Sequence, residues 1–464
     1  MRTWTPEQVA RAAGARLVSP PPTSTGPERA IIDSREAGPG TLFVGLVGER
    51  ADGGAFAPQA LAAGAWGVLT TPEHAEAARC AVPGALIAAE NPLAAMQRLA
   101  TAWRRALDVK VIGVTGSTGK TSTKDLLLAI LAPHRRTVAS RANFNTEIGL
   151  PLEILAAPAD TQVLVLEMAM RGAGQIAELA AVAEPEVGVI VSIGPVHLEL
   201  LGSVDAIAAA KAELIAGLKP GGTAVIPADE PLLEPHRRAD LETVTFGAGG
   251  DVRLLRSAEE RVEIDLAGRS VVLEVSFTQA HLRRNLLAAA AAARAVGVLP
   301  EGRVALELSP GRGQRTPLPG RVTLIDDCYN ANPMSMRAAL EDLAETATRA
   351  QGARPVAVLG DMLELGPRER DYHRELGEEA ERAGVRELIT VGPLAATIAE
   401  RFDGTVHSVH DAAAAADLVP RLIRPGDVVL IKASRGVGLE LVCHALSAHR
   451  PAPDPAITPA GAGA

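Results

Sequence analysis

The segment 109–124 constrains the fold of this chain more than any other. It opens with apolar residues that predict a buried strand, turns through Gly116 and Gly119, and enters a helical pattern near Lys120. A strand, a glycine-rich loop and a helix in this order form a phosphate cradle, because backbone N–H groups and the helix N-terminus face the anion. Lys120 offers a cation to the outer phosphates, and the Thr121 hydroxyl is placed to bind Mg²⁺. The segment therefore predicts a nucleotide-binding α/β domain.

The loop departs from the common pattern G-x-x-x-x-G-K-[ST], which requires a glycine where Val114 stands. A chance turn rich in glycine, serine and threonine is the alternative interpretation, but the flanking strand and helix favour nucleotide binding. The residues that we expect to contact the nucleotide are Thr115, Gly116, Ser117, Thr118, Gly119, Lys120, Thr121 and Ser122.

Length and composition limit the class of protein. A chain of 464 residues is too long for one core and suggests about three domains. Its net charge of -9 argues against a general nucleic-acid binder, and no apolar run reaches the roughly 18 residues of a membrane span. The first residues lack the apolar stretch of a secretory signal, so we expect a cytoplasmic protein. Cys80, Cys328 and Cys443 are far apart in the sequence and indicate neither a metal site nor a disulfide framework.

Lysine is rare in this chain, and arginine carries nearly all of the 46 basic residues. Lysine can be deprotonated where a compact neutral amine is needed, whereas arginine cannot. This usage directs attention to Lys120, Lys211 and Lys432.

Alternating strand and helix patterns predict an α/β protein of three domains. We predict an N-terminal α/β domain at 1–107, a central nucleotide-binding domain at 108–309 and a C-terminal domain at 310–447, with the Pro/Ala/Gly-rich residues 448–464 disordered. The C-terminal domain is expected to be a Rossmann-like parallel sheet, with strands at 322–327, 356–359, 388–391 and 428–431.

Polar residues follow two strands of the central domain. Glu167 ends the apolar strand 163–166, where a carboxylate opposite a phosphate loop is typical of a Mg²⁺ ligand. Its alternative role is to cap the next helix. His197 follows the strand 187–193, and a structural histidine is the alternative there.

Two helical side chains of this domain are ambiguous from pattern alone. Lys211 lies among alanines in a predicted helix, a setting that favours a solvated lysine. Asn285 lies four residues after His281, on the same side of a second predicted helix. Its amide suits an adenine edge, although a capping or packing role is equally compatible.

A polar turn in the N-terminal domain comprises Asp33, Ser34 and Arg35. It combines an acceptor, a hydroxyl and a bidentate donor, which suit a phosphorylated ligand. A solvated turn with one ion pair is the alternative.

Taken together, the segments from about residue 31 to residue 440 resemble the Mur ligase family of ATP-dependent amide-bond-forming enzymes. The T-G-S-T-G-K-T loop is similar to that family's form, and D-D-C-Y-N-A-N-P at 326–333 resembles the motif of one type within the family. That type adds D-alanyl-D-alanine to UDP-N-acetylmuramoyl-tripeptide in peptidoglycan precursor synthesis, through an acyl phosphate. The Asp-Asn-Pro-Arg motif of the sibling that adds a diamino acid is absent from the sequence.

The resemblance implies roles for residues around the phosphate loop. Lys120 would assist catalysis, and Thr121 and Glu167 would hold a first Mg²⁺. A carbamylated Lys211 and His197 would hold a second Mg²⁺.

Further roles are implied for nucleotide and substrate binding. Asn285 would contact adenine, while Arg312 and Asp327 would contact phosphate and ribose, with Arg321 as the competing candidate for Arg312. The residues implied for substrates are Ser34 and Arg35 for UDP, Asn145 and Thr146 for the muramoyl end, and Asn330, Lys432, Ser434 and Arg435 for the dipeptide or phosphate side.

Two other functions stay open at this point. One is another amide ligase, such as a folylpolyglutamate synthase-like enzyme, which would not need the turn at 33–35 and the N-terminal module. The other is a nucleotide-binding interaction protein that has lost catalysis, against which Glu167, His197 and Lys211 argue by their presence. We expect a monomer, and the sequence leaves the third residue of the tripeptide undetermined.

Overall fold

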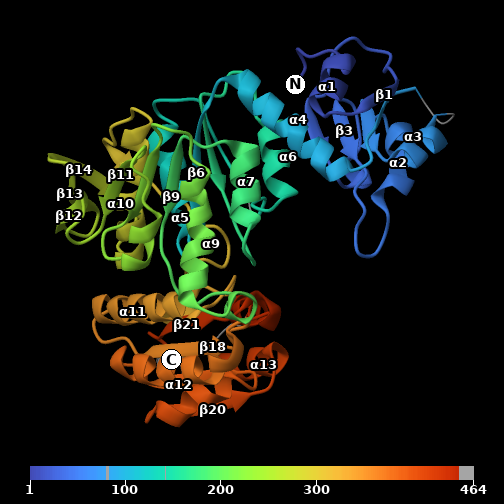
Figure 1. Ribbon diagram of the computed structural model, residues 1–464. Helices are drawn as coiled ribbons and strands as arrows, with labels where there is room; N and C mark the ends of the chain where they lie inside the picture. Colours follow the sequence, from blue (N-terminus) through green and yellow to red (C-terminus); the bar gives the residue numbers. More distant parts are fainter. Residues whose placement is uncertain (80–82, 142, 449–464) are drawn as a thin grey trace, which may run out of the picture. The chain divides into compact units, whose positions relative to one another are not determined.

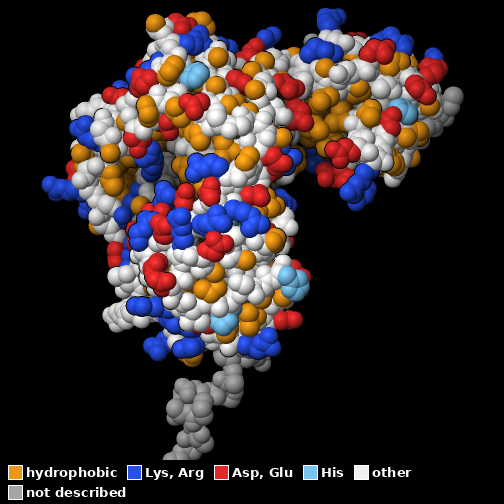
Figure 2. Space-filling view, turned by 60° about the horizontal axis from the view of Figure 1, so that its bottom comes forward, with side chains coloured by type: hydrophobic (Ala, Val, Ile, Leu, Met, Phe, Trp, Pro, Cys, Tyr) orange, Lys and Arg blue, Asp and Glu red, His pale blue; other side chains and the backbone are white. Residues whose placement is uncertain are grey.

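The computed structural model describes residues 1–79, 83–141 and 143–448. This part of the chain is a mixed α/β protein with three sheets, which confirms the predicted fold class (Figure 1). None of the helices in the described ranges has both the length and the apolar character that crossing a membrane requires. Acidic and basic side chains are interspersed over the face seen in Figure 2. The predicted disordered tail lies outside the described residues, apart from Ala448, which ends α14 (Glu440–Ala448).

Contacts divide the chain into two compact units. The first comprises Met1–Ile193 and Asp205–Leu306, and the second comprises Gly194–Val204 and Glu307–Ala464. The short segment that carries His197 therefore packs with the C-terminal unit, although it interrupts the nucleotide-binding segment in the sequence. The finer division into three domains stays a prediction.

The first sheet has five strands in the order β1-β5-β4-β3-β2, parallel except at β1. Its elements are α1 (Pro6–Ala12), β1 (Arg16–Ser19), β2 (Arg29–Ile31), β3 (Thr41–Val44), α2 (Ala57–Ala62), β4 (Gly67–Thr70), α3 (Pro72–Ala78), β5 (Ala85–Ala88) and α4 (Pro92–Leu107). A capping box starts α1, because the Thr5 hydroxyl accepts from the Gln8 N–H at 3.3 Å and the Gln8 side chain accepts from the Thr5 N–H at 2.7 Å.

The second sheet has ten strands and carries the phosphate loop. Its elements are β6 (Lys110–Thr115), α5 (Lys120–Leu131), β7 (Thr137–Ala139), α6 (Gly149–Ala156), β8 (Val163–Glu167), α7 (Gln175–Ala183), β9 (Val187–Ile190), α9 (Val204–Ala216), β10 (Thr223–Pro227), β11 (Glu242–Phe246), β12 (Val252–Ser257), β13 (Arg261–Leu266), β14 (Arg269–Val275), α10 (Ala280–Ala295) and β15 (Arg303–Val304). Strand β6 lies between β8 and β9, so its carboxyl end is a switch point, where open α/β sheets bind ligands. Strands β12, β13 and β14 form an antiparallel meander that the sequence patterns did not predict.

The third sheet has six strands in the order β16-β17-β21-β18-β19-β20. Its elements are β16 (Gln314–Leu318), β17 (Val322–Asp326), α11 (Pro333–Arg349), β18 (Pro355–Gly360), α12 (Glu369–Arg382), β19 (Glu387–Val391), β20 (Thr405–Val409), α13 (Ala412–Leu422), β21 (Val428–Lys432) and α14. Leu359 belongs to a core cluster with α11 and α12, whereas Val358 belongs to one with α13 and α14. Helices therefore cover both faces of the sheet. The predicted all-parallel order is wrong at one edge, where β16 pairs antiparallel with β17.

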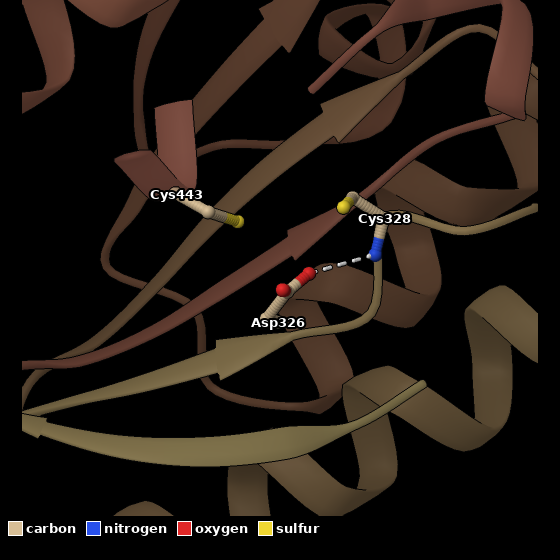
Figure 3. A group of neighbouring side chains, drawn as sticks. All are labelled: Asp326, Cys328 and Cys443. Atoms are coloured by element: carbon tan, nitrogen blue, oxygen red, sulfur yellow. Dashed lines mark hydrogen bonds between the residues drawn. The ribbon is translucent and has the colours of Figure 1, made fainter. Parts of the chain in front are cut away.

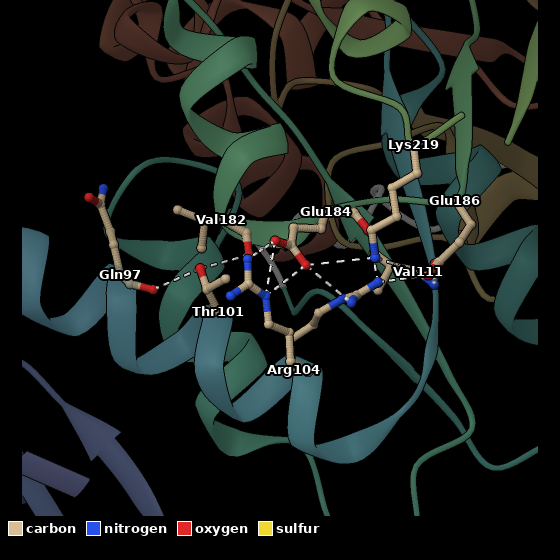
Figure 4. A network of polar contacts seen from close by, with 9 residues as sticks. Gln97, Thr101, Arg104, Val111, Val182, Glu184, Glu186 and Lys219 are labelled. Carbon is tan, nitrogen blue, oxygen red and sulfur yellow. Dashed lines mark hydrogen bonds and ion pairs between the residues drawn. The ribbon is translucent and has the colours of Figure 1, made fainter. Parts of the chain in front are cut away.

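An ion-pair network centred on the buried Arg104 joins α4 to the segment between α7 and β9 (Figure 4). Arg104 is 5% exposed and donates to the carboxylates of Glu184 and Glu186 at 3.3 and 2.7 Å. The other oxygen of Glu186 accepts from the Val111 N–H of β6 at 2.7 Å. The network therefore fixes α4 against the strand that leads into the phosphate loop.

Replacing Arg104 tests this link. Arg104→Ala is expected to lower the free energy of unfolding by about 3 kcal/mol, because it leaves two carboxylates without their buried cation. Arg105→Ala is the matched control, since Arg105 also binds Glu184 but its side chain is 64% exposed. Its loss is expected to stay below about 1 kcal/mol. Urea unfolding followed by circular dichroism measures the loss of unfolding free energy in each variant. Equal losses in the two variants would contradict the assignment of Arg104 as the buried link.

Candidate active site

The phosphate loop is held by backbone contacts to the segment after β9. The N–H groups of Ser117 and Thr118 donate to the carbonyl and the hydroxyl of Ser192, each at 2.9 Å. Gly119 precedes α5 with φ of 79°, and a Cβ there would lie 2.8 Å from the Asn285 amide oxygen. Both the left-handed backbone and the close approach of Asn285 therefore require glycine. Ser192 was not among the predicted site residues.

The remaining loop residues follow the predicted order from β6 into α5. Thr115 ends β6, and its hydroxyl donates to the Met168 carbonyl at 2.8 Å. The Lys120 ammonium donates to the Gly116 carbonyl at 2.8 Å, so this side chain folds back over the loop. Ser122 is half-buried in the first turn of α5.

Glu167 is buried at the end of β8 and is bound from three sides. Its carboxylate accepts from the Thr121 hydroxyl at 2.8 Å and from the Asn145 amide at 2.9 Å, and its N–H donates to the Ser140 hydroxyl at 2.9 Å. The structure thus brings the two predicted Mg²⁺ ligands of the loop region together. The alternative role as a helix cap is wrong, because Gly174 precedes α7. The sequence had suggested neither Ser140 nor the contact between Asn145 and Glu167.

Lys211 is buried, 2% exposed, on α9. The pattern-based expectation of a solvated lysine is therefore wrong. Burial, and to a lesser degree the nearby Lys120 cation, hold the pKa of Lys211 well below its ordinary value. The site consequently favours the neutral amine.

His197 lies in the second compact unit, directly before the short helix α8 (Leu198–Leu201), with φ of 52°. Its Nδ1 binds the Glu364 carboxylate, which comes from the segment after β18. Pairing with a carboxylate orients the imidazole and is common for metal-binding histidines. The sequence patterns gave no indication of Glu364, because it lies far from His197 in the chain.

Asp327 and Lys432 form an ion pair where β17 and β21 end side by side. Lys432 is 2% exposed, and its ammonium lies 2.6 Å from the Asp327 carboxylate and 2.9 Å from the Asn330 carbonyl. Burial raises the pKa of the Asp327 carboxyl, and Lys432 opposes this shift. The side chain of Asn330 accepts from the Ala331 N–H at 2.9 Å.

The ring of Tyr329 contacts two of the predicted binding residues. The guanidinium carbon of Arg312 is 4.1 Å from the ring centroid, and that of Arg435 is 5.3 Å away. Ser434 is buried and its hydroxyl accepts from the Leu363 N–H at 2.9 Å. Tyr329 was not predicted as a site residue, although it stands inside the motif 326–333.

The competing candidate Arg321 is exposed and lies in the turn between β16 and β17, with φ of 59°. The preference for Arg312 over Arg321 as the phosphate-binding residue stays a prediction.

The polar turn of the N-terminal sheet is closed by its own ion pair. The Arg35 guanidinium lies 2.5 Å from the Asp33 carboxylate and holds its pKa at about 2. The Arg35 side chain is 84% exposed, and Ser34 is half-buried. At the start of α6 the Thr146 hydroxyl accepts from the Gly149 N–H at 3.4 Å.

Two family descriptions match this chain. The Mur ligase middle domain matches residues 114–293, which include the phosphate loop, Glu167, Lys211 and Asn285. The Mur ligase, glutamate ligase domain matches residues 311–435. The chain belongs to the Mur ligase family.

Relatives within the Mur ligase family match almost the whole chain. The UDP-N-acetylmuramoyl-tripeptide–D-alanyl-D-alanine ligase of Synechocystis is 38% identical, over 90% of this chain and 92% of the relative. The ligase of the same name from Bacillus subtilis is 35% identical, over 94% and 96% of the two chains.

Solved structures of MurF enzymes are similar to this chain over nearly its full length. MurF from Acinetobacter baumannii is 28% identical, with a TM-score of 0.85 over 96% of this chain and 98% of that one. MurF from Thermotoga maritima in complex with ADP is 30% identical, with a TM-score of 0.79 over 90% and 97% of the two chains. A folylpolyglutamate synthase/dihydrofolate synthase from Yersinia pestis shares the fold at 20% identity and a TM-score of 0.55.

The Asp327–Lys432 pair predicts a pH-dependent stability. In Lys432→Met the folded-state pKa of Asp327 rises further, because the ammonium that opposes burial is lost. A carboxyl with a raised pKa binds more protons in the folded state, so stability falls as pH rises from the unfolded to the folded pKa. We expect Lys432→Met to cost about 3 kcal/mol at pH 8 and clearly less at pH 5.

Urea unfolding at both pH values measures this difference. Arg435→Met is the matched control, because it removes an exposed cation from the same loop and leaves the pair intact. A cost of Lys432→Met that is the same at pH 5 and pH 8 would argue against an uncompensated Asp327.

Proposed function

We propose that this protein is an ATP-dependent ligase that joins D-alanyl-D-alanine to the terminal carboxylate of UDP-N-acetylmuramoyl-tripeptide in peptidoglycan precursor synthesis. The observation that carries the proposal is the similarity over nearly the full length of this chain to ligases named for that reaction. The phosphate loop beside Glu167 supports ATP as the energy source. The enzyme acts as a monomer in the cytoplasm, where ATP and nucleotide-linked precursors occur together.

The reaction requires two anions to approach each other. The tripeptide carboxylate attacks the γ-phosphorus of ATP, which gives an acyl phosphate and ADP. The dipeptide amine then attacks the acyl carbon, and phosphate leaves. Lys120 and the backbone N–H groups of the loop stabilise the charge that develops on the transferring phosphoryl group.

The donor set near the loop suits Mg²⁺. The Thr121 hydroxyl and the Glu167 carboxylate are hard oxygen ligands only 2.8 Å apart, so we assign a first Mg²⁺ to them. Carbamylation of Lys211 by CO₂ requires a neutral amine, which its lowered pKa favours. Carbamylated Lys211 would hold a second Mg²⁺ together with His197. When bound, Mg²⁺ would neutralise phosphate charge and help to align the reacting groups.

The remaining assignments follow the resemblance. Asn285 contacts adenine, Arg312 a phosphate and Asp327 the ribose. The substrate residues that we propose are Ser34 and Arg35 for UDP, Asn145 and Thr146 for the muramoyl end, and Asn330, Lys432, Ser434 and Arg435 for the dipeptide or phosphate side. Asn145 also orients Glu167, and Lys432 also restrains Asp327.

Phosphate release from ATP tests the proposal directly. We expect release only when UDP-N-acetylmuramoyl-tripeptide and D-alanyl-D-alanine are both present, with a ligated product confirmed by mass spectrometry. Lysine and diaminopimelate tripeptides are compared in parallel. Release with a single amino acid or glutamate would indicate a different amide ligase. ATP binding without any release would indicate a protein that has lost catalysis.

Lys211→Ala tests the carbamate. We expect ligation to fall by at least about 100-fold, because a metal ligand is lost, and to recover in part with added short-chain carboxylates. Lys219→Ala is the control, since its side chain is 43% exposed and pairs with Glu184 and Glu186 away from the loop. Near-normal turnover of Lys211→Ala would remove the carbamate role.

A further inference from the structure

Three potential metal ligands meet in the second compact unit. Asp326 ends β17, Cys328 follows two residues later, and Cys443 projects from α14 toward both (Figure 3). One carboxylate oxygen and the two sulfur atoms all lie within 4.8 Å of one another. The wide spacing of the cysteines in the sequence had indicated no metal site, and the fold brings the side chains of Cys328 and Cys443 close together.

The size of this triangle fits an ion. If all three sides were 4.8 Å long, its centre would lie about 2.8 Å from each ligand atom. Zinc binds sulfur at about 2.3 Å and carboxylate oxygen at about 2.0–2.2 Å, so a small inward movement suffices. Cys328 is already oriented by its N–H, which donates to the Asp326 carboxylate at 3.3 Å.

The chemistry of the ligands selects the kind of ion. Mg²⁺ and Ca²⁺ prefer oxygen ligands, whereas two thiolates with one carboxylate suit Zn²⁺. We propose that Asp326, Cys328 and Cys443 bind a thiophilic divalent cation of the Zn²⁺ class, with a water molecule completing a tetrahedral site. This inference goes beyond the proposed ligase reaction and does not depend on it.

Burial of the two thiols fits a bound ion. Cys328 and Cys443 are each 6% exposed, while the half-buried Asp326 leaves one side open to solvent. A bound cation displaces the two thiol protons to solvent, so the binding step is balanced without an oxidant.

The ion would cross-link elements that are distant in the sequence. It would join α14, the last described helix, to the segment that also carries Asp327 and Tyr329. Because the site forms only in the folded chain, binding stabilises the fold by mass action. The expected effect is structural: a more stable third sheet and a fixed position for the loop after β17.

Cobalt titration of the full-length, metal-stripped and reduced protein tests the site. We expect one Co²⁺ per chain, with a thiolate-to-cobalt charge-transfer band in the near ultraviolet. One equivalent of Zn²⁺ should bleach the band, and millimolar Mg²⁺ should leave it unchanged. Native mass spectrometry of the wild-type protein should show one Zn²⁺ with the loss of two protons, a readout that needs no variant.

Three variants and one control locate the ligands. Cys328→Ser and Cys443→Ser should each lower the Co²⁺ affinity at least about 100-fold, and Asp326→Asn should shift the absorption while both sulfur ligands remain. Cys80→Ser removes the third thiol of the chain and should bind Co²⁺ as the wild type does. Absence of the charge-transfer band in the wild-type protein, its survival in Cys443→Ser, or a Cys328–Cys443 disulfide in place of the ion would overturn the proposal.

Discussion

A buried carboxylate must be paired, and the centre of the nucleotide-binding unit is arranged to pair Glu167. Burying an unpaired carboxylate costs roughly several kcal/mol, so the folded protein needs hydrogen-bond partners for Glu167. The parallel register sets Glu167 opposite Val114, one residue before β6 ends. The loop that follows β6 then returns Thr121 to the carboxylate from the first turn of α5. The hydrogen bond between Thr121 and Glu167 therefore joins the phosphate loop region to the acidic end of β8, and the Asn145 amide binds the same carboxylate.

The second unit also places carboxylates at a strand end, where they meet side chains from other segments. Asp326 and Asp327 are neighbours at the end of β17, and consecutive side chains of a strand point to opposite sides. Asp327 consequently pairs with Lys432, whereas Asp326 faces Cys328 and Cys443. One strand end thus supplies both the Asp327–Lys432 ion pair and the cluster of Asp326 with two thiols. The paired carboxylates of the sequence have separate partners.

The rare lysines illustrate how far composition can guide an interpretation. Lys120, Lys211 and Lys432 were singled out because lysine is scarce, and each lies in a specific environment. Lys120 folds onto a loop carbonyl, Lys211 is buried with a lowered pKa, and Lys432 neutralises a carboxylate. Scarcity alone did not separate them from Lys124, which is also buried and donates to the Ser140 carbonyl. The distinction required the neighbouring side chains.

The sequence by itself determined the strand, loop and helix of the phosphate cradle and the α/β class, because these depend on local spacing and periodicity. The family followed from the resemblance of its motifs. It also predicted the acidic end of β8, since an apolar run that stops at a carboxylate is visible in one segment. Only the tertiary structure decided which groups meet: Glu364 with His197, Ser140 with Glu167, and Cys443 with Cys328. The antiparallel β16 and the β12–β14 meander were likewise decided there. The physical reason is that hydrogen bonds, ion pairs and metal ligation act over a few ångströms in space, and the folded sheets, not the sequence spacing, set those distances.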